Sequence, residues 1–480
     1  MSGARDRGAL AIVLHTHMPY VEGFGTWPFG EEWLWEAIAS SYLPVLGLLD
    51  AGAALTLSVT PVLLDQLEAP GLEDRFAGFI DGVRRVTHER DAAGLRETGH
   101  GQLGDEVERC WLEDYAPAPE RLRSIPGGLL AGLARHARWT SSATHAILPL
   151  IATDAAVRLQ VQAGIDSHRR RTAREWGGGF WLPECAYAPW LLRALEDAGV
   201  GAVCVELTAQ LGVGAPGHLR PFITDAGVVL APIDRQTMAL VWSQSGYPSA
   251  GPYRDYHHLT IHHHNPWNND GGPYDARAAR ALAAEHAADF VARTIARLQR
   301  ARRQGGNGGP QAGGLVICAL DTELLGHWWY EGCAWLEAVV QECRRQGLEL
   351  VHLDDALTEL EPLALPAGVA DRPCSWGKDC DLSTWSGTAV ADVAFTTRAA
   401  ELEVIRAGSG VGGEAVRELL ALQSSDWAFM VSRDIAAPYA HERFNAHRAA
   451  LSRALEGADG AAQALRNIAV DADRALLLAP

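Results

Sequence analysis

The chain has 480 residues, of which 48% are hydrophobic and 21% charged, a composition that fits a globular protein of one large domain with additions or of two to three domains. Its formal net charge is −18, which repels nucleic-acid backbones and anionic lipid, so we expect neither nucleic acid nor membrane as a partner. Lys378 is the only lysine, so nearly all positive charge is arginine. A neutral substrate is the natural expectation.

The N-terminus and the cysteines indicate a cytoplasmic protein. The first apolar run is too short for a secretion signal and ends in histidines. No stretch approaches the roughly 18 to 20 apolar residues that a membrane helix needs. The eight cysteines are scattered without a CxxC pattern, and several lie in apolar runs, as free thiols do.

Short apolar runs that end at a polar residue recur along the chain and predict strands. They lie at residues 9–14, 54–60, 180–183, 202–205, 315–320 and 348–353. Helical patterns lie between several of them, including most of residues 62–140 and a run that has Asp154 in an early turn. This alternation predicts a parallel sheet, and polar residues at the strand ends favour a complete or incomplete barrel over an open sheet.

The middle and the end of the chain depart from this alternation. Residues 209–275 are rich in Gly, Pro, Tyr and His without clear periodicity, so we expect a small inserted subdomain with long loops. Residues 276–302 are strongly helical in pattern. From about residue 390 onward only helical periodicity is found, which predicts an all-α C-terminal region.

Glu184 and Asp321 are the leading candidates for catalytic groups. Each ends a predicted buried strand, so both side chains should emerge at the same end of a barrel, where barrel enzymes carry their catalytic residues. A retaining glycosidase needs two such carboxylates about 5 to 5.5 Å apart, one as nucleophile and one as acid/base. The neighbouring Trp181 and Trp328 would raise the pKa of the acid. The alternative is that each carboxylate only caps the helix that follows it.

Histidines raise the question of a metal site. His15 and His17 alternate at period two, so they should point to opposite faces if strand geometry persists, with one facing the pocket. A metal would need a third ligand such as His145 or Asp321. Because HExxH and zinc-type Cys/His spacings are absent, we expect no metal and favour hydrogen bonds to sugar hydroxyls. The histidine-rich residues 257–264 are expected to be partly exposed and structural.

Tryptophan is unusually frequent, with sixteen in the chain. Core packing explains some of them. Those in Gly-, Asp- or Ser-rich settings fit platforms on which sugar rings stack, and they are Trp27, Trp267, Trp376, Trp385 and Trp427. The chain has no glycine-rich phosphate loop after a strand and no G-x-S-x-G elbow, which disfavours nucleotide binding and serine-hydrolase chemistry.

Four sequence blocks arrive in the order of those of glycoside hydrolase family 57. The blocks are LHTHMPYVEG, ATHAILPL, GGFWLPECAY and LDTELLGHWWYEG. Other stretches are similar to the members of that family that branch α-1,4-glucan, among them WPFGEEWLWEA, PYDARAARALAAEHAADFV and LLALQSSDWAFM. The resemblance therefore covers essentially the whole chain.

This resemblance implies a fold of class α/β, namely an incomplete (β/α)7 barrel with a small inserted domain and an all-α C-terminal domain. We expect residues 1–190 to form the first part of the barrel, 191–250 the inserted domain, 251–375 the second part of the barrel, and 376–480 the helical domain. No metal or organic cofactor is implied, because the two carboxylates carry the chemistry.

The resemblance also implies roles for single residues. Glu184 would be the nucleophile and Asp321 the general acid/base. Tyr247 matches the tyrosine of a mobile loop linked to transfer, and Arg254 would lie near the acceptor. Together with the loop tryptophans, the residues expected to bind substrate are His15, His17, Trp27, His145, Tyr247, Arg254, Trp267, Trp376, Trp385 and Asp426.

The expected reaction is cleavage of an α-1,4 bond and formation of an α-1,6 branch with retained configuration, through a covalent glycosyl-enzyme intermediate. The donor and the acceptor would both be α-1,4-glucan, amylose or glycogen-like. Three alternatives stay open. They are an α-glucan hydrolase of the amylase type on the same scaffold, a metal-dependent polysaccharide deacetylase that uses His15, His17 and Asp321, and a non-catalytic glycan-binding protein.

Overall fold

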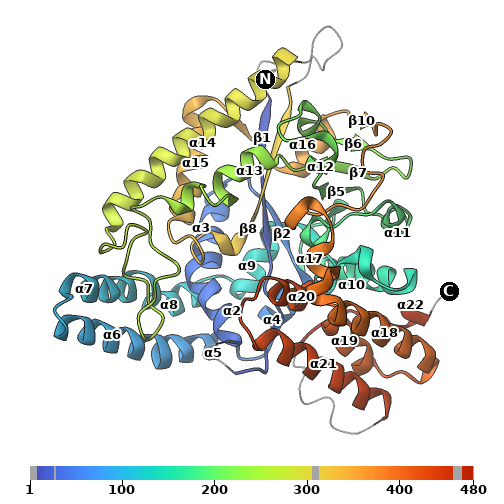
Figure 1. Cartoon of the computed structure of the whole chain (residues 1–480), viewed down its shortest axis with the longest axis horizontal. Coiled ribbons are helices and arrows are strands. Elements are labelled where there is room, and N and C mark those ends of the chain that lie inside the picture. The colour runs from blue at the N-terminus through green and yellow to red at the C-terminus, as the bar shows by residue number, and fades with distance from the viewer. Residues whose placement is uncertain (1–7, 26–28, 305–312, 458–466, 479–480) are drawn as a thin grey trace.

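The computed structural model describes residues 8–25, 29–304, 313–457 and 467–478, which form a curled sheet wrapped by helices and a separate group of C-terminal helices (Figure 1). The strands are β1 (Ala9–Thr16), β2 (Thr56–Val59), β3 (Ala137–Ser141), β4 (Gly179–Trp181), β5 (Ala202–Val205), β6 (Phe222–Ile223), β7 (Val229–Pro232), β8 (Leu315–Asp321), β9 (Glu349–Leu350) and β10 (Leu363–Ala364). Their order is β10-β6-β7-β5-β4-β3-β2-β1-β8, and β9 also pairs with β1.

The longest paired strands of the sheet are β1 and β8, which stand at one end of the strand order. Both strands are apolar runs buried on both faces, which is the environment of a parallel sheet covered by helices. They pair in parallel with His15 opposite Asp321, so the polar residues at their carboxyl ends lie side by side.

The sheet curls into an incomplete (β/α)7 barrel, as expected. The strands β7, β5, β4, β3, β2, β1 and β8 run parallel, while the short β6 is antiparallel to β7. Between β7 and β8 the described residues form no ladder, but Asp234, just after β7, donates its backbone N–H to the carbonyl oxygen of Ile317 at 2.8 Å. The carboxylate of Asp234 also forms a buried ion pair with Arg297 at 3.2 Å, which ties this open side of the barrel to a covering helix.

Helices cover the outside of the barrel. Their bounds are α2 (Glu31–Ala37), η1 (Ile38–Tyr42, π-helical), α3 (Leu43–Asp50), α4 (Pro61–Glu68), α5 (Leu72–Phe79), η2 (Ile80–Arg84), α6 (Arg85–Glu97), α7 (Gly101–Cys110), η3 (Trp111–Tyr115), α8 (Ala118–Arg123), α9 (Gly128–His136), α10 (Asp154–Arg171), α11 (Leu192–Asp197), α12 (Thr208–Leu211), α13 (Arg235–Trp242), α14 (Ala276–Gln304), α15 (Gly332–Gln346) and α16 (Leu353–Glu359). None of the helices in the described ranges is both long and apolar enough to cross a membrane.

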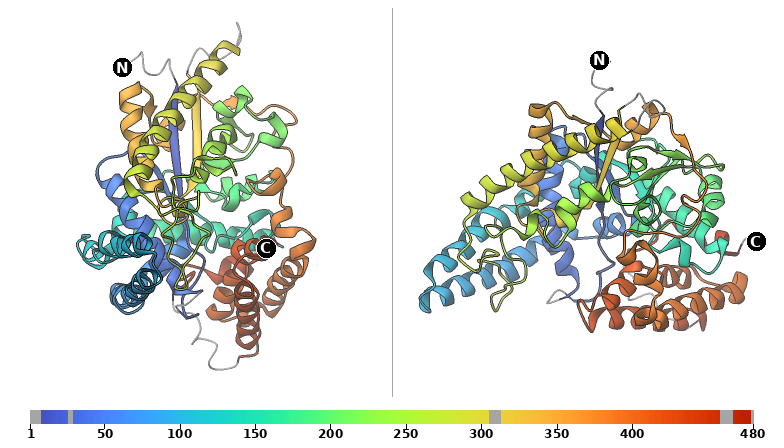
Figure 2. Two further views of the ribbon diagram at one scale, coloured as in Figure 1. Left: turned by 60° about the vertical axis from the view of Figure 1, so that its left-hand side comes forward. Right: turned by 45° about the horizontal axis from the view of Figure 1, so that its top comes forward.

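A helical hairpin of α6 and α7 stands out from the barrel, and the segment of residues 251–274 descends onto it (Figures 1 and 2). The histidine-rich loop is anchored there, because Asp91 of α6 accepts from His262 at 2.6 Å and from His264 at 2.8 Å. His264 is buried and His262 is half-buried, so this loop has the structural role that was expected.

The C-terminal region is helical, as predicted. Its helices are α17 (Ser383–Ser386), α18 (Ala391–Ala407), α19 (Gly413–Leu422), α20 (Ser425–Ser432), α21 (Tyr439–Leu455) and α22 (Arg474–Leu478). Their hydrophobic core includes Leu419 and Trp427 and is continuous with barrel residues such as Val62 and Leu159. The first residue of α20 reaches the barrel, where Ser425 donates its N–H to the carbonyl oxygen of His145 at 3.1 Å.

Some expected elements differ from the structure. The strand β3 lies in a stretch predicted to be mostly helical, and the expected strand at 348–353 is reduced to β9 because α16 begins at Leu353. Residues 191–250 contribute β5, β6 and β7 to the main sheet, so this much of the expected inserted domain is continuous with the barrel. The four domain boundaries themselves remain a prediction.

Candidate active site

Polar side chains gather at the carboxyl ends of the parallel strands. Asp321 is the last residue of β8, and Glu184 lies three residues beyond β4, in the short turn η5 (Pro183–Cys185). The two carboxyl groups are close enough for the charge of Asp321 to raise the pKa of Glu184. The arrangement is the one that barrel enzymes use for catalysis, with each group delivered by a different strand.

The backbone at two of these residues is strained. Glu184 has a φ of 61° and His145 a φ of 59°, in the left-handed region that residues with side chains rarely adopt. Glu184 is held there because its carbonyl oxygen accepts the backbone N–H of Trp376 at 3.0 Å. Strain of this kind is retained where it aims a functional side chain.

The carboxyl group of Glu184 has a specific donor. The indole Nε1 of Trp376 donates to Oε2 at 2.7 Å, and Nδ1 of His145 lies 3.9 Å from Oε1. Burial raises the pKa of Glu184 to about 8, with the charges of Asp321 and Asp426 adding to the rise and the Trp376 hydrogen bond opposing it. The indole N–H therefore favours the charged form of Glu184.

Asp321 lies beside a third acid. Burial raises the pKa of Asp321 to about 7, the charge of Glu323 adds to this, and His17 opposes it. Oε1 of Glu323 accepts the backbone N–H of His17 at 3.1 Å and the hydroxyl of Tyr42 at 2.6 Å. Glu323 thus fixes the backbone of His17 and acts on the charge of Asp321.

The two candidate catalytic carboxyls form a coupled pair. Both have raised pKa values, and the charge of Asp321 adds to the rise at Glu184, so the protonation of one depends on that of the other. The Trp376 N–H favours the charged form of Glu184 alone, but the pKa of Glu184, about 8, still lies above that of Asp321, about 7, so a bound substrate has to move the proton to Asp321. One charged and one protonated carboxyl is the state that a nucleophile and a general acid require.

Three histidines line the same site. The rings of His17 and His145 are stacked at 3.9 Å, and His15 lies 5.0 Å from His145 and 4.7 Å from Trp181. Strand geometry does not persist to His17, because β1 ends at Thr16, and the rings of His15 and His17 lie 5.9 Å apart instead of on opposite faces. Burial, with the charge of His17, lowers the pKa of both His15 and His145, so these two rings are neutral hydrogen-bonding groups.

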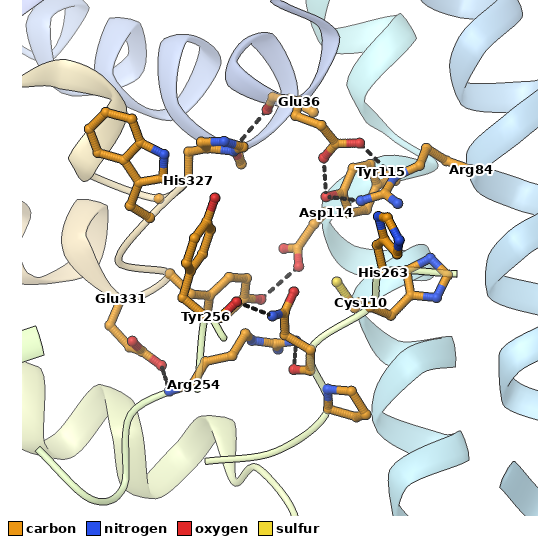
Figure 3. A pocket seen from close by; sticks show the side chains of 18 of the residues that line it. Glu36, Arg84, Cys110, Asp114, Tyr115, Arg254, Tyr256, His263, His327 and Glu331 are labelled. Atoms are coloured by element: carbon orange, nitrogen blue, oxygen red, sulfur yellow. Dashed lines mark hydrogen bonds and ion pairs between the residues drawn. The ribbon is translucent and has the colours of Figure 1, made fainter. Parts of the chain in front are cut away.

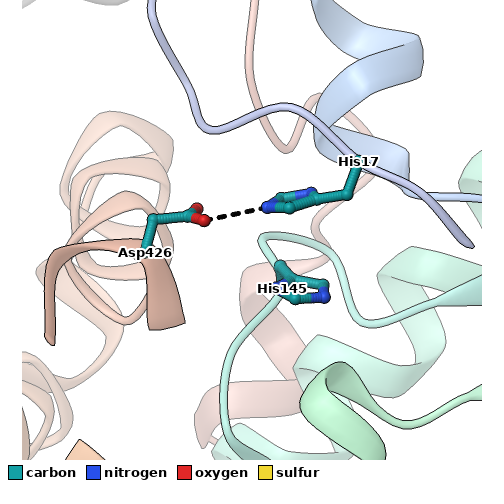
Figure 4. A group of neighbouring side chains, drawn as sticks. All are labelled: His17, His145 and Asp426. Atoms are coloured by element: carbon teal, nitrogen blue, oxygen red, sulfur yellow. Dashed lines mark hydrogen bonds and ion pairs between the residues drawn. The ribbon is translucent and has the colours of Figure 1, made fainter. Parts of the chain in front are cut away.

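His17, His145 and Asp426 are the one group within the described residues whose spacing would suit a metal ion (Figure 4). Their ring nitrogens already have protein partners. Nε2 of His17 contacts Asp426 at 3.0 Å, while His145 contacts His15 at 2.9 Å and Ser425 at 2.8 Å. A metal would have to break these contacts, so the geometry favours a hydrogen-bonded array, with Asp426 polarising His17.

The other expected substrate-binding residues do not contact this array directly. Tyr247 is buried, stacks on His286 at 4.5 Å and donates to Asp289 of α14 at 2.7 Å. Arg254 is half-buried, and its guanidinium lies between the rings of Tyr274 and Tyr330 at 4.3 and 3.9 Å.

Two of the expected tryptophans also lie elsewhere. Trp267 stacks on His258 at 3.8 Å, in the segment that covers the helical hairpin. Trp385 is buried in the core of the C-terminal helices, with Gly377 against its six-membered ring. Trp27 lies outside the described residues. The structure thus brings together His15, His17, His145, Glu184, Asp321, Trp376 and Asp426.

Two residues of the array are missing from the sequence prediction. Glu323 is visible as part of the dense group of acids and aromatics after β8, but nothing in the sequence separated it from Asp321 in role. Tyr42 gives no signal, because it lies within an ordinary helical pattern and reaches the site through the π-helical turn η1.

Comparison with known proteins agrees with this site and fold. The sequence model described as Glycosyl hydrolase family 57 matches residues 139–367, and the one described as 1,4-alpha-glucan branching enzyme, C-terminal, matches residues 403–473. The chain is also 33% identical over 501 residues to a probable 1,4-alpha-glucan branching enzyme of Mycobacterium tuberculosis, covering 94% of this chain and 92% of that protein. The chain belongs to Glycosyl hydrolase family 57.

Two solved structures were also found to be similar to this chain. A family 57 branching enzyme of Thermococcus kodakaraensis, crystallised with glucose, superposes with a TM-score of 0.81 at 28% identity, covering 93% of this chain and 90% of that one. The alpha-amylase AmyC of Thermotoga maritima superposes with a TM-score of 0.75 at 22% identity, covering 98% and 95%, which shows the shared fold alone.

Proposed function

We propose that the chain is a 1,4-alpha-glucan branching enzyme, which cuts an α-1,4 bond of a glucan and rejoins the released chain as an α-1,6 branch. The observation that carries the proposal is the coupled pair Glu184 and Asp321, with the Trp376 N–H on only one member. The relatives named as branching enzymes over almost the whole chain support the choice of reaction.

In the first half of the reaction, Glu184 attacks C1 of the glucose unit at the scissile bond while Asp321 gives its proton to the leaving oxygen. The glycosidic bond breaks, the shortened chain leaves with a free 4-hydroxyl, and the cut segment is held as an ester on Glu184. In the second half, Asp321 takes the proton of a glucose 6-hydroxyl. That oxygen attacks C1 and releases Glu184, so two inversions give retained configuration.

His15, His17 and His145 are proposed to hydrogen-bond the sugar that reacts. Nδ1 of His15 has no partner among the described residues and could bond a hydroxyl, whereas a hydroxyl that bonds His145 would replace one of its protein partners. Asp426 would keep the proton of His17 directed along their contact. Trp376, which lies edge-on to Trp181 at 5.2 Å, would provide an apolar face beside the reacting sugar.

Transfer has to outcompete attack by water, which requires an acceptor held close to the intermediate. Tyr247 remains the proposed contributor to this step, and its bond to Asp289 would have to open for its loop to move. Replacing Tyr247 by Ala should lower branching while release of reducing sugar persists. If both activities fall equally, Tyr247 has no specific part in transfer.

Linkage analysis of amylose after incubation with the protein tests the proposal. New α-1,6 linkages are expected. Release of reducing sugar without new branches would instead support the amylase-type hydrolase, which the AmyC fold keeps as the second candidate. Activity lost on adding a chelator would support the deacetylase, and binding without any product a glycan-binding protein. The expected cytoplasmic location stays a prediction.

A further inference from the structure

A cavity lies beside the catalytic site and does not include either catalytic carboxyl (Figure 3). It has a volume of about 570 Å³ and is lined by residues of α2, η1, the hairpin of α6 and α7, the segment 254–274 and the segment 326–334. This volume is within the range of about 300 to 1,000 Å³ in which most ligand-binding pockets fall.

One turn of the chain separates the cavity from the catalytic site. Ser40 of η1 lines the cavity, whereas the next residue, Ser41, donates to the carbonyl oxygen of Thr322 at 2.8 Å on the catalytic side. The turn is tightly packed, since a Cβ added to Gly326 would stand 1.9 Å from the carbonyl oxygen of Ser40. The cavity is thus a direct neighbour of Thr322, which follows Asp321.

Most charged groups of the cavity wall are neutralised by each other. Arg84 pairs with Glu36 at 2.6 Å and donates to Tyr115 at 3.0 Å, as Figure 3 shows. Arg254 pairs with Glu106, and its backbone N–H donates to Glu331 at 3.2 Å. These groups form a fixed polar frame and offer no free charge of either sign to a ligand.

Among the acids of this wall, Glu32 is the one without an ion pair or a side-chain hydrogen bond within the described residues. The residue is only 8% exposed, and its Oε2 is buried without a hydrogen-bond partner among the described residues. Burial raises the pKa of Glu32 to about 8, with the charge of Glu36 adding and Arg84 opposing. A buried polar group without a partner costs stability, so its retention in the wall points to a partner brought by a ligand.

Aromatic rings complete the lining. Trp33 lies beside Glu32, while Tyr256 and Trp328 are 42% and 41% exposed. A ligand that matches this wall needs apolar CH faces for the rings and hydroxyl groups for a neutral carboxyl. The wall has four acids and four arginines, so it favours neither an anion nor a cation, and Glu32 disfavours a purely apolar ligand. A neutral sugar chain satisfies all of these requirements.

We propose that this cavity is a second binding site for α-glucan, in which Glu32 hydrogen-bonds sugar hydroxyls and Trp328 and Tyr256 stack on sugar faces. The identity of the sugar rests on the proposed function. A chain held there lies one turn of backbone away from the residues that follow Asp321, and so at the flank of the reacting sugar.

The test uses the full chain made inert by Glu184→Gln, so that maltoheptaose is bound without turnover. Calorimetric titration of this parent should show binding at two sites. Adding Glu32→Leu or Trp328→Ala should weaken one of them about tenfold or more and leave the other unchanged. The matched control is Trp190→Ala, which removes another exposed indole, 60% accessible, from a different part of the surface and should change neither site.

Unchanged affinities and stoichiometry in both Glu32→Leu and Trp328→Ala would overturn the inference, as would an equal loss in Trp190→Ala. Thermal unfolding of each variant, recorded beside the titration, shows that a loss of binding does not come from loss of the fold. The proposed function is tested separately, by linkage analysis of amylose treated with the unmodified chain. Branching without a second site would leave the function standing and remove this inference alone.

Discussion

The catalytic end of the barrel and the neighbouring cavity both contain carboxyl groups with raised pKa values. The two regions differ in whether the protein supplies hydrogen-bond donors to these groups. Glu184 and Glu323 have protein donors, which are the indole of Trp376, the hydroxyl of Tyr42 and the backbone of His17. Glu32 has no hydrogen-bond partner on its buried oxygen among the described residues. Groups that react must be aimed before the substrate arrives, whereas a binding group can take its partner from the ligand.

The largest expected effects come from replacing the two catalytic carboxyls. Glu184→Gln and Asp321→Asn should each lower the kcat/KM of branching by about 10⁴-fold or more, because each removes a reacting group. The measurement is the initial rate of new α-1,6 linkages in amylose. A loss of only a few-fold in either variant would show that the reacting carboxyl has been assigned wrongly. Glu89→Gln, on the exposed face of α6, is the matched control.

Removing the donor on Glu184 should have a smaller effect. Trp376→Phe keeps an apolar ring but loses the N–H, so we expect a fall of about 10- to 100-fold in kcat/KM. Because this hydrogen bond lowers the pKa of Glu184, the acidic limb of the pH profile should move to higher pH. Trp335→Phe, at a buried indole with no hydrogen-bond partner, should leave the limb in place. An unmoved limb in Trp376→Phe would contradict the role of the N–H.

Glu32, whose buried oxygen has no partner among the described residues, should affect the free energy of unfolding. The pKa of Glu32 is raised to about 8 in the folded state, so between its ordinary range and pH 8 the folded state binds more protons than the unfolded state. Glu32 therefore costs increasing stability as the pH rises. Glu32→Leu should raise the free energy of unfolding by about 2 kcal/mol at pH 8 and by less at pH 5. Equal changes at both pH values, measured by denaturant unfolding, would refute this.

The smallest expected effect concerns Glu323. Its charge raises the pKa of Asp321, so Glu323→Gln should move the alkaline limb of the kcat/KM profile to lower pH, with a loss of a few-fold at the optimum. Glu337→Gln, an exposed acid on α15, serves as control. If the limb keeps its position while activity falls, Glu323 acts only by holding the backbone of His17.

The catalytic carboxyls were predictable because each follows an apolar run that can only be a buried strand. The strands β3 and β7 were not, since β3 carries an arginine and β7 lies in a stretch without periodicity. Contacts between segments far apart in the sequence could not be predicted from local residue patterns. His17 and Asp426, for example, are 409 positions apart, and their hydrogen bond exists only because α20 packs against the end of the barrel.

Residues such as Tyr247 and Trp385 show the limit of matching motifs. Their identities fit the pattern of the family, but a motif does not state where a side chain points. In this chain Tyr247 is held by α14, and Trp385 is packed within the C-terminal helices. The packing of neighbouring helices decides such orientations, and that information is spread over the whole chain.

Lys378 gives the site an experimental handle. It is the only lysine of the chain, it is exposed, and it lies two residues after Trp376 in the short turn η11 (Lys378–Cys380). Because an α-amine has a lower pKa than a lysine side chain, the N-terminal amine can be blocked first near neutral pH. An amine-reactive fluorophore applied afterwards at higher pH would label one side chain beside the donor to Glu184. The emission of such a single dye would follow glucan entry and departure in real time, without any engineered cysteine.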